Sequence, residues 1–220
     1  MSQLLCDADI RTYLHQHVRL AHPGDSALFL DEFPLYGGDV RADLVVVNGR
    51  LHGYEIKSAR DTLDRLPRQV QAYGAVFDRA SIVVSECHLD SARRLVPAWW
   101  EVLVAQCVGG GVCFKFDRRG RANPDREALA LTALLWRAEA YAILQSLGLD
   151  AGMRSASMSE MMDKLAEHVK VQKLGELVRH KLRARGDWLS AARRKRDGET
   201  CQQPANRYRY RRNRRSRTLQ

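Results

Sequence analysis

The stretch that decides the fold is Arg41-Ala-Asp-Leu-Val-Val-Val-Asn-Gly-Arg-Leu-His-Gly-Tyr-Glu-Ile-Lys-Ser58. Apolar and β-branched residues stand on both sides of an Asn-Gly pair, the pattern of two antiparallel strands joined by a tight turn. Three charged residues, Asp43, Glu55 and Lys57, interrupt these otherwise apolar strands. Because an unpaired buried charge is unfavourable, these residues need an explanation, and a metal site would supply one.

The length of the turn decides whether the two carboxylates meet. A two-residue loop of Asn48-Gly49, which Asn-Gly pairs usually favour, pairs Asp43 with Tyr54 and leaves the carboxylates on opposite faces. A three-residue loop over 48–50 sets Asp43 opposite Glu55 on one face of the hairpin. We predict the odd-length loop, because it explains the charges.

Apolar periodicity predicts an α/β arrangement for the first part of the chain. Around the hairpin we expect helices over 7–20, 67–77 and 89–95, and strands over 27–33, 80–85, 99–105 and 112–116. Pro67 suits the first turn of its helix, where a missing N–H does no harm. Trp99-Trp100 fits core packing better than a platform for stacked bases.

The character of the chain becomes helical from Pro124 onward. Leu, Ala and Met recur at spacings of three and four, which predicts helices over 125–147, 159–168, 172–185 and 187–194, with Ser157 or Ser159 as a cap. We therefore expect an α/β core over 1–122, a helical module over 123–195 and a disordered Arg-rich tail over 196–220.

The positive charge is concentrated at the C-terminal end. Residues 191–220 hold eleven Arg and Lys residues against Asp197 and Glu199, a net charge of +9 out of +10 for the whole chain. Tyr208 and Tyr210 lie among the arginines, a composition that suits phosphate contact and base stacking without sequence preference. The residues expected to contact nucleic acid are Arg207, Arg209, Arg211, Arg212, Arg214 and Arg215. The alternative is a tail that only aids solubility.

Several classes of protein are not expected. No stretch approaches the roughly 18–20 apolar residues of a membrane span, and residues 1–6 lack the basic and apolar pattern of a secretory signal. We therefore expect a cytoplasmic protein with no membrane partner. The five cysteines contain no C-x-x-C pair and the seven histidines are scattered, so neither a disulfide framework nor a zinc site is expected.

Asp43, an antiparallel turn and then Glu55-Ile56-Lys57 resemble the PD-(D/E)XK nuclease superfamily. Gln69-x-x-x-Tyr73 on the next helix resembles the Gln-x-x-x-Tyr element of its RecB-like branch, and residues four apart share a helical face. The order of helix, three strands, helix and strand also agrees, over about residues 7–85, although the proline that usually precedes the aspartate is absent. Leu134-Leu-Trp-Arg137 is similar to a helix of bacterial and phage proteins, from which no function follows.

The resemblance implies a restriction-endonuclease-like core, a mixed sheet flanked by helices, and a divalent-metal-dependent nuclease acting on DNA. It implies that Mg²⁺ or Mn²⁺ is bound by Asp43, Glu55 and the carbonyl of Ile56, with Glu32 as a further candidate ligand. Lys57 would orient or deprotonate the attacking water or offset developing charge. Gln69 and Tyr73 would position phosphate or support the site. Candidates for further phosphate contact are Arg41, Ser58, Arg60, Arg65 and Arg68.

Other interpretations stay open. Asp43 paired with Lys57 or Arg41 would be a plain ion pair, and Gln69 and Tyr73 would then be ordinary helix positions. At the level of function, one alternative is a nucleic-acid-binding or adaptor protein that has this fold without catalysis. Another is a structural protein that binds its partner through the helical module.

Overall fold

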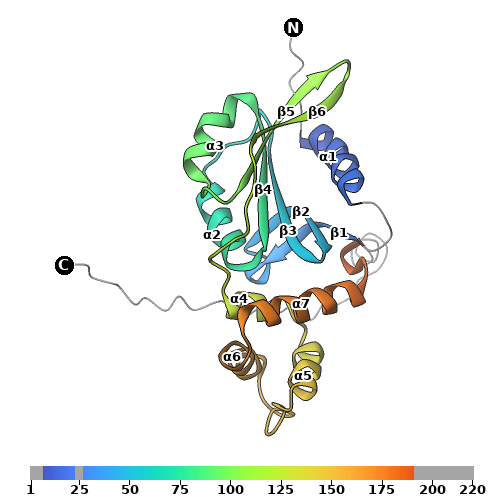
Figure 1. Cartoon of the computed structure of the whole chain (residues 1–220), viewed down its shortest axis with the longest axis vertical. Helices are drawn as coiled ribbons and strands as arrows, with labels where there is room; N and C mark the ends of the chain where they lie inside the picture. The colour runs from blue at the N-terminus through green and yellow to red at the C-terminus, as the bar shows by residue number, and fades with distance from the viewer. Residues whose placement is uncertain (1–6, 23–26, 191–220) are drawn as a thin grey trace, which may run out of the picture.

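The computed structural model describes residues 7–22 and 27–190. Its centre is a six-stranded sheet whose strands follow chain order (Figure 1). The strands are β1 (Leu28–Leu35), β2 (Val40–Asn48), β3 (Arg50–Lys57), β4 (Arg79–Ser85), β5 (Glu101–Val108) and β6 (Gly111–Arg118). Strands β1 to β3 are antiparallel, β3 to β5 are parallel, and β6 is antiparallel to β5. This mixed sheet confirms the predicted α/β class.

The turn between β2 and β3 has the predicted odd length. Asn48 lies opposite Arg50 with Gly49 between them, and Gly49 has a φ of 62°, which glycine adopts without steric penalty. The paired register ends with Leu44 opposite Tyr54, and just beyond it the Asp43 carboxylate accepts from the N–H of Ile56, the residue after Glu55. The turn is therefore the odd-length turn predicted from the charged residues, not the two-residue turn that Asn-Gly pairs usually form.

Helices cover both faces of the sheet (Figure 1). On one face, α1 (Asp7–Ala21) buries Ile10, Leu14 and Val18 against apolar residues of β2, β3 and β4. On the other face lie α2 (Leu66–Val76) and α3 (Leu89–Leu95), and Pro67 is in the first turn of α2 as predicted. Two short 3-10 helices, η1 (Tyr36–Gly38) and η2 (Glu86–His88), complete this part.

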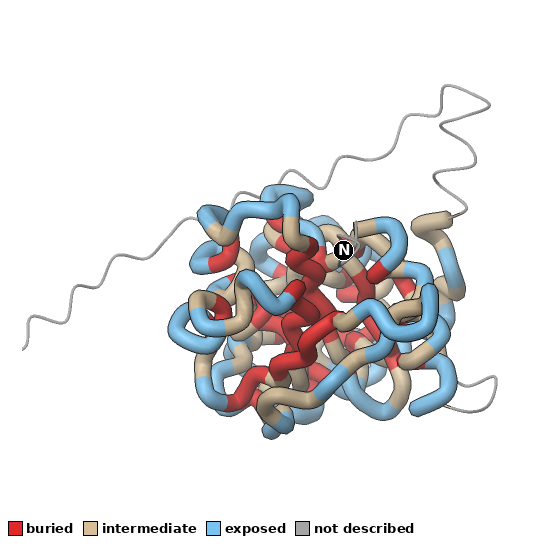
Figure 2. Tube along the Cα trace, turned by 90° about the horizontal axis from the view of Figure 1, so that it is seen from above, coloured by how far each residue is buried: buried red, intermediate tan, exposed pale blue. Residues whose placement is uncertain are grey.

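Four further helices follow the sheet: α4 (Ala128–Thr132), α5 (Arg137–Ser146), α6 (Met158–His168) and α7 (Val171–Arg185). They share one buried apolar cluster with the α2 face of the sheet, and buried residues fill the centre of the molecule (Figure 2). Ser157 caps α6: its hydroxyl accepts from the N–H of Glu160, whose carboxylate accepts from the N–H of Ser157. This capping box satisfies N–H groups at the helix start.

The predicted continuous helix over 125–147 is wrong, because α4 and α5 are separate helices. Trp136 has extended backbone, with φ −78° and ψ 156°, and its N–H donates to the Glu139 carboxylate at 2.8 Å. Arg185 of α7 donates to the Leu134 carbonyl at 2.9 Å. The break is therefore stabilised by a helix cap and a tertiary contact.

Some predictions concern residues outside the described ranges. Of the helix expected over 187–194, residues 188–190 are helical and 191–194 lie beyond the described part, as does the tail over 196–220. None of the described helices combines the length and apolar character needed to cross a membrane.

Candidate functional site

Glu55 is the centre of the site. Its side chain is buried, 2% exposed, on the face of β3 that α2 covers. Lys57 Nζ donates to Glu55 Oε1 at 2.8 Å, Gln69 Nε2 donates to the same oxygen, and the Tyr73 hydroxyl donates to Oε2 at 2.7 Å. Four residues singled out in the sequence therefore form one hydrogen-bonded cluster.

Packing fixes the helix residues of this cluster. Gln69 and Tyr73 are one turn apart on α2, so both reach the same strand. The Tyr73 ring is stacked on Trp100, with 5.1 Å between the ring centroids, and its hydroxyl also donates to the Tyr54 carbonyl at 3.1 Å. Trp99 and Trp100 are buried, which confirms core packing for this pair.

The cluster shifts the ionisation of its acids. Burial, and after it the charge of Asp43, raises the pKa of Glu55 to about 7, although Lys57 and Tyr73 act in the opposite direction. Burial and the charge of Glu55 raise the pKa of Tyr73 well above its ordinary value. Glu55 therefore exchanges its proton near neutral pH, and Tyr73 acts as a hydrogen-bond donor.

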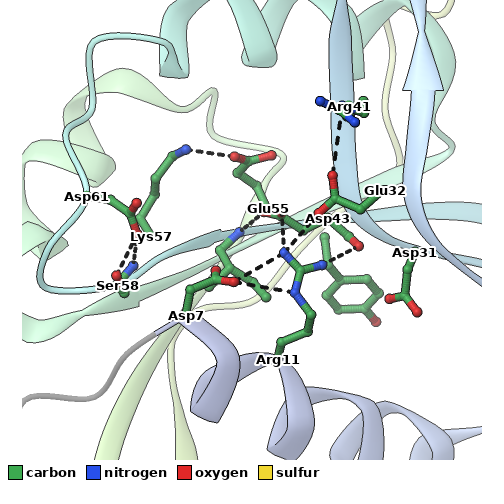
Figure 3. A network of polar contacts seen from close by, with 12 residues as sticks. Asp7, Arg11, Asp31, Glu32, Arg41, Asp43, Glu55, Lys57, Ser58 and Asp61 are labelled. Atoms are coloured by element: carbon green, nitrogen blue, oxygen red, sulfur yellow. Dashed lines mark hydrogen bonds and ion pairs between the residues drawn. The ribbon is translucent and has the colours of Figure 1, made fainter. Parts of the chain in front are cut away.

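Asp43 links the cluster to helix α1 (Figure 3). Its Oδ2 accepts from the N–H of Ile56, the residue after Glu55, at 2.8 Å. Its Oδ1 accepts from Arg11 Nη2 at 2.8 Å, and Arg11 Nη1 donates to the Asp43 carbonyl at 2.8 Å. Burial raises the pKa of Asp43, an effect that the Ile56 N–H and the Arg11 charge reduce.

Arg11 is a site residue that the sequence analysis missed. Besides Asp43, its Nη2 lies 3.2 Å from Glu32 Oε1 and 3.4 Å from Asp7 Oδ2. Burial lowers the pKa of Arg11, but these three acids together raise it above its ordinary value. Asp7 and Arg11 are four apart on α1, a local signal of an ion pair. Nothing local indicates that the guanidinium also meets Asp43.

Glu32, whose face was left open by the sequence, points its carboxylate at this cluster. It has a φ of 52°, which is uncommon for a residue other than glycine. Its carboxylate meets Arg11 and lies 3.9 Å from Arg41 Nε. Glu32 therefore adjoins Asp43 through the shared guanidinium.

The residues present fit a divalent cation. Gln69 Oε1 is buried with no hydrogen-bond partner in the described part of the chain, and its orientation is set because Nε2 donates to Glu55. A buried amide oxygen without a donor is unfavourable, and a cation or its water would satisfy it. No three His, Cys, Asp or Glu side chains within 7–22 and 27–190 form a metal-ligand set. A cation bound here would draw on Asp43, Glu55 and a backbone carbonyl.

The predicted phosphate-contacting residues near the site are of two kinds. The exposed ones are Arg41, Arg60, Arg65 and Arg68. Arg68 pairs with Asp39 at 3.1 Å, and both side chains are largely exposed. Ser58 is different, because its N–H and hydroxyl donate to Asp61 Oδ2 at 2.7 and 2.6 Å and close the turn after β3. Its hydroxyl is thus already bonded.

Comparisons with known proteins place the chain in a sequence family. The family model described as Bacteriophage P4 protein cII matches residues 3–197. Protein cII of Enterobacteria phage P4 is 24% identical over 178 residues, which are 81% of this chain and 67% of that protein. The SPO1766 protein of unknown function from Silicibacter pomeroyi aligns with 84% of this chain and 89% of its own, at 15% identity and a TM-score of 0.37.

Proposed function

This chain belongs to the family of bacteriophage P4 protein cII, and we propose that it is a divalent-metal-dependent nuclease that hydrolyses phosphodiester bonds in DNA. One observation carries the proposal: the buried Glu55 is held by Lys57, Gln69 and Tyr73, and the Asp43 carboxylate accepts from the N–H of the next residue, Ile56. The resemblance of these five residues to the PD-(D/E)XK nucleases supports it. The family match itself assigns no activity.

Each residue of the site has a separate proposed role. Asp43, Glu55 and the carbonyl of Ile56 would hold Mg²⁺ or Mn²⁺, which stabilises charge on the phosphate and lowers the pKa of a bound water. Gln69 Oε1, which has no partner among the described residues, accepts a hydrogen bond from a water beside Glu55. Lys57 orients the attacking water and offsets the negative charge that develops on the phosphate.

A cleavage assay on four kinds of DNA tests this function. Linear, circular, single-stranded and branched DNA are incubated with Mg²⁺, with Mn²⁺ or with EDTA. We expect DNA cleavage in the presence of Mg²⁺ or Mn²⁺ and none with EDTA. Lys57→Ala is expected to cleave about 100-fold more slowly while its circular dichroism spectrum stays the same as that of wild type. Cleavage of the circle would show endonuclease action. Failure to cleave any of the four substrates with either metal would contradict the proposal.

A second candidate is a nucleic-acid-binding or adaptor protein without catalysis. The observation that favours it is that both Asp43 oxygens already have partners in the protein, Arg11 and the Ile56 N–H. Carboxylate oxygens keep further lone pairs for a metal, so the two candidates differ in metal binding. Calorimetry with Mg²⁺ distinguishes them: heat of binding that disappears in Asp43→Asn supports the nuclease, and DNA binding without Mg²⁺ binding supports the second candidate.

A further inference from the structure

A second polar site lies at the end of β3 away from Glu55, beside the turn at Gly49. A cavity of about 260 Å³ opens there between the start of β4 and helix α7. Its charged wall residues are Arg50, Arg79, Arg126, Arg179, Asp78 and Glu176. Arg50 and Glu55 are five positions apart along the strand, a distance of about 17 Å. We propose that this pocket binds a phosphate group.

Asp78 holds two of the arginines in place. Its Oδ1 pairs with Arg126 Nη1, and its Oδ2 accepts from Arg179 Nη1 at 2.9 Å and from the Leu51 N–H at 2.7 Å. The side chains of Arg126, Arg179 and Asp78 are 14%, 17% and 15% exposed. The two guanidiniums are therefore preorganised and largely withdrawn from water.

Gly175 of α7 makes room for both guanidiniums. A Cβ atom at Gly175 would lie 3.0 Å from Arg126 Nη1 and 3.3 Å from Arg179 Nη1. Contacts this short are tighter than most real Cβ contacts, so the two guanidiniums would have to shift by a few tenths of an ångström. The absent side chain therefore lets Arg126 and Arg179 lie against the helix and converge on Asp78.

The charges of the pocket do not balance. One carboxylate serves two guanidiniums, and the other acid of the wall, Glu176, pairs with Lys173 at 3.1 Å. In the described ranges, Arg79 Nε is buried without a hydrogen-bond partner. A cluster that only tied the helices to the sheet would gain from matched charges, because partly buried, uncompensated guanidiniums are unfavourable. The surplus positive charge favours an anionic ligand.

Phosphate is the anion that these donors fit best. A guanidinium offers several N–H groups in a planar fork that matches phosphate oxygens. Arg126 and Arg179 each pair with Asp78 through Nη1, which leaves their other N–H groups for a ligand. Exposed Arg50 stands at the mouth beside Gly49. The phosphate belongs either to a nucleic acid backbone or to a small phosphorylated molecule, and the experiment separates these two sources.

Nuclear magnetic resonance of the full chain tests the pocket. Titration with inorganic phosphate is expected to shift the backbone amides of Gly49, Arg50 and Gln172. Arg179→Gln and Arg50→Gln are each expected to weaken this binding by about tenfold or more. Both variants are expected to keep their fold. In Arg179→Gln, Arg126 and the Leu51 N–H still bond Asp78, and Arg50 is exposed. The charge-matched control Arg94→Gln, on α3, leaves the shifts unchanged.

Two outcomes would overturn the proposal: no shift at these amides, or equal shifts in both pocket variants and the wild type. Titrations with a single-stranded DNA oligonucleotide and with pyrophosphate show whether the bound phosphate belongs to nucleic acid or to a small molecule. The ligand that shifts the same amides at the lower concentration identifies the class. Asp43→Asn is expected to keep these shifts, because Asp43 lies at the other end of the hairpin. Phosphate binding at this pocket can therefore be tested independently of nuclease activity.

Discussion

Glu55 is a buried acid that keeps three side-chain partners, and its protonation couples the site to pH. Lys57 and the Tyr73 hydroxyl favour the carboxylate form, but burial and the charge of Asp43 outweigh them. A cation bound between Asp43 and Glu55 would remove this repulsion. The pKa of Glu55 would therefore report metal binding.

The stability of the metal-free protein is expected to depend on Glu55. Its pKa of about 7 lies above the ordinary 4.5, so the folded state binds the proton more tightly than the unfolded state. The contribution to the free energy of unfolding is then complete below pH 4.5 and is lost as the pH rises to 7. We expect wild type to lose up to about 3 kcal/mol more than Glu55→Gln over this interval. Urea denaturation of both proteins at about pH 5 and pH 7.5 measures this difference. An equal loss in unfolding free energy in wild type and Glu55→Gln would contradict the raised pKa of Glu55.

Arg11 compensates the acids of the site from the α1 side. Removing it leaves Asp43 and Glu32 without this guanidinium, so we expect Arg11→Gln to destabilise the metal-free protein by roughly 2 kcal/mol. Mg²⁺ is expected to raise the melting temperature of Arg11→Gln more than that of wild type, because the cation restores positive charge beside Asp43. Arg19→Gln, an exposed change on the same helix, is the control. An equal Mg²⁺ effect in all three proteins would exclude this role of Arg11.

Sequence alone predicts the part of the site that depends on local spacing. The pair Glu55 and Lys57 follows from strand alternation, and Gln69 and Tyr73 follow from the helical repeat. Arg11 could not be found in this way, because its contact with Asp43 joins residues 32 positions apart through the docking of α1 on the sheet. The same docking determines where Glu32 points.

The hairpin and the helices after the sheet differ in how far local pattern controls them. The hairpin carries its own charge pattern, which predicts the observed odd-length turn against the two-residue turn that Asn-Gly pairs usually form. The helical pattern over 125–147 is broken at Trp136 without Gly or Pro, since Arg185 of α7 bonds both Leu134 and Glu139 beside the break. The contacts of Arg185 with this break join residues distant in sequence and could not be predicted from local pattern.

Gly53 of β3 is expected to be required for the seating of α2. A Cβ at Gly53 would lie 2.5 Å from the Phe77 ring, at the end of α2. We expect Gly53→Ala to lower the free energy of unfolding by about 1–3 kcal/mol through overpacking. Gly74→Ala, on α2 itself, meets no atom within 4 Å and is expected to be neutral or stabilising. Urea denaturation of the two variants checks the contrast, and equal effects would contradict it.

The sheet and the C-terminal helices share one buried apolar cluster. Asp78 adds a polar tie, since it bonds the start of β3 and both Arg126 and Arg179. We expect Asp78→Asn to destabilise the chain by roughly 3 kcal/mol, because it leaves two partly buried guanidiniums without a carboxylate. Chemical denaturation measures it, with Asp117→Asn, whose partner Arg93 is exposed, as a control of small effect. A loss no larger than in the control would show that the tie is unimportant.

The most direct test of the central claim is Mg²⁺-dependent cleavage of DNA by wild type and Asp43→Asn. The control is Asp39→Asn, an exposed acid that lies just before the same strand and pairs with exposed Arg68. Wild type and Asp39→Asn are expected to cleave with Mg²⁺ and to stop with EDTA. Asp43→Asn is expected to lose about 100-fold or more in rate while it keeps its fold. Equal cleavage by Asp43→Asn and wild type would contradict the account.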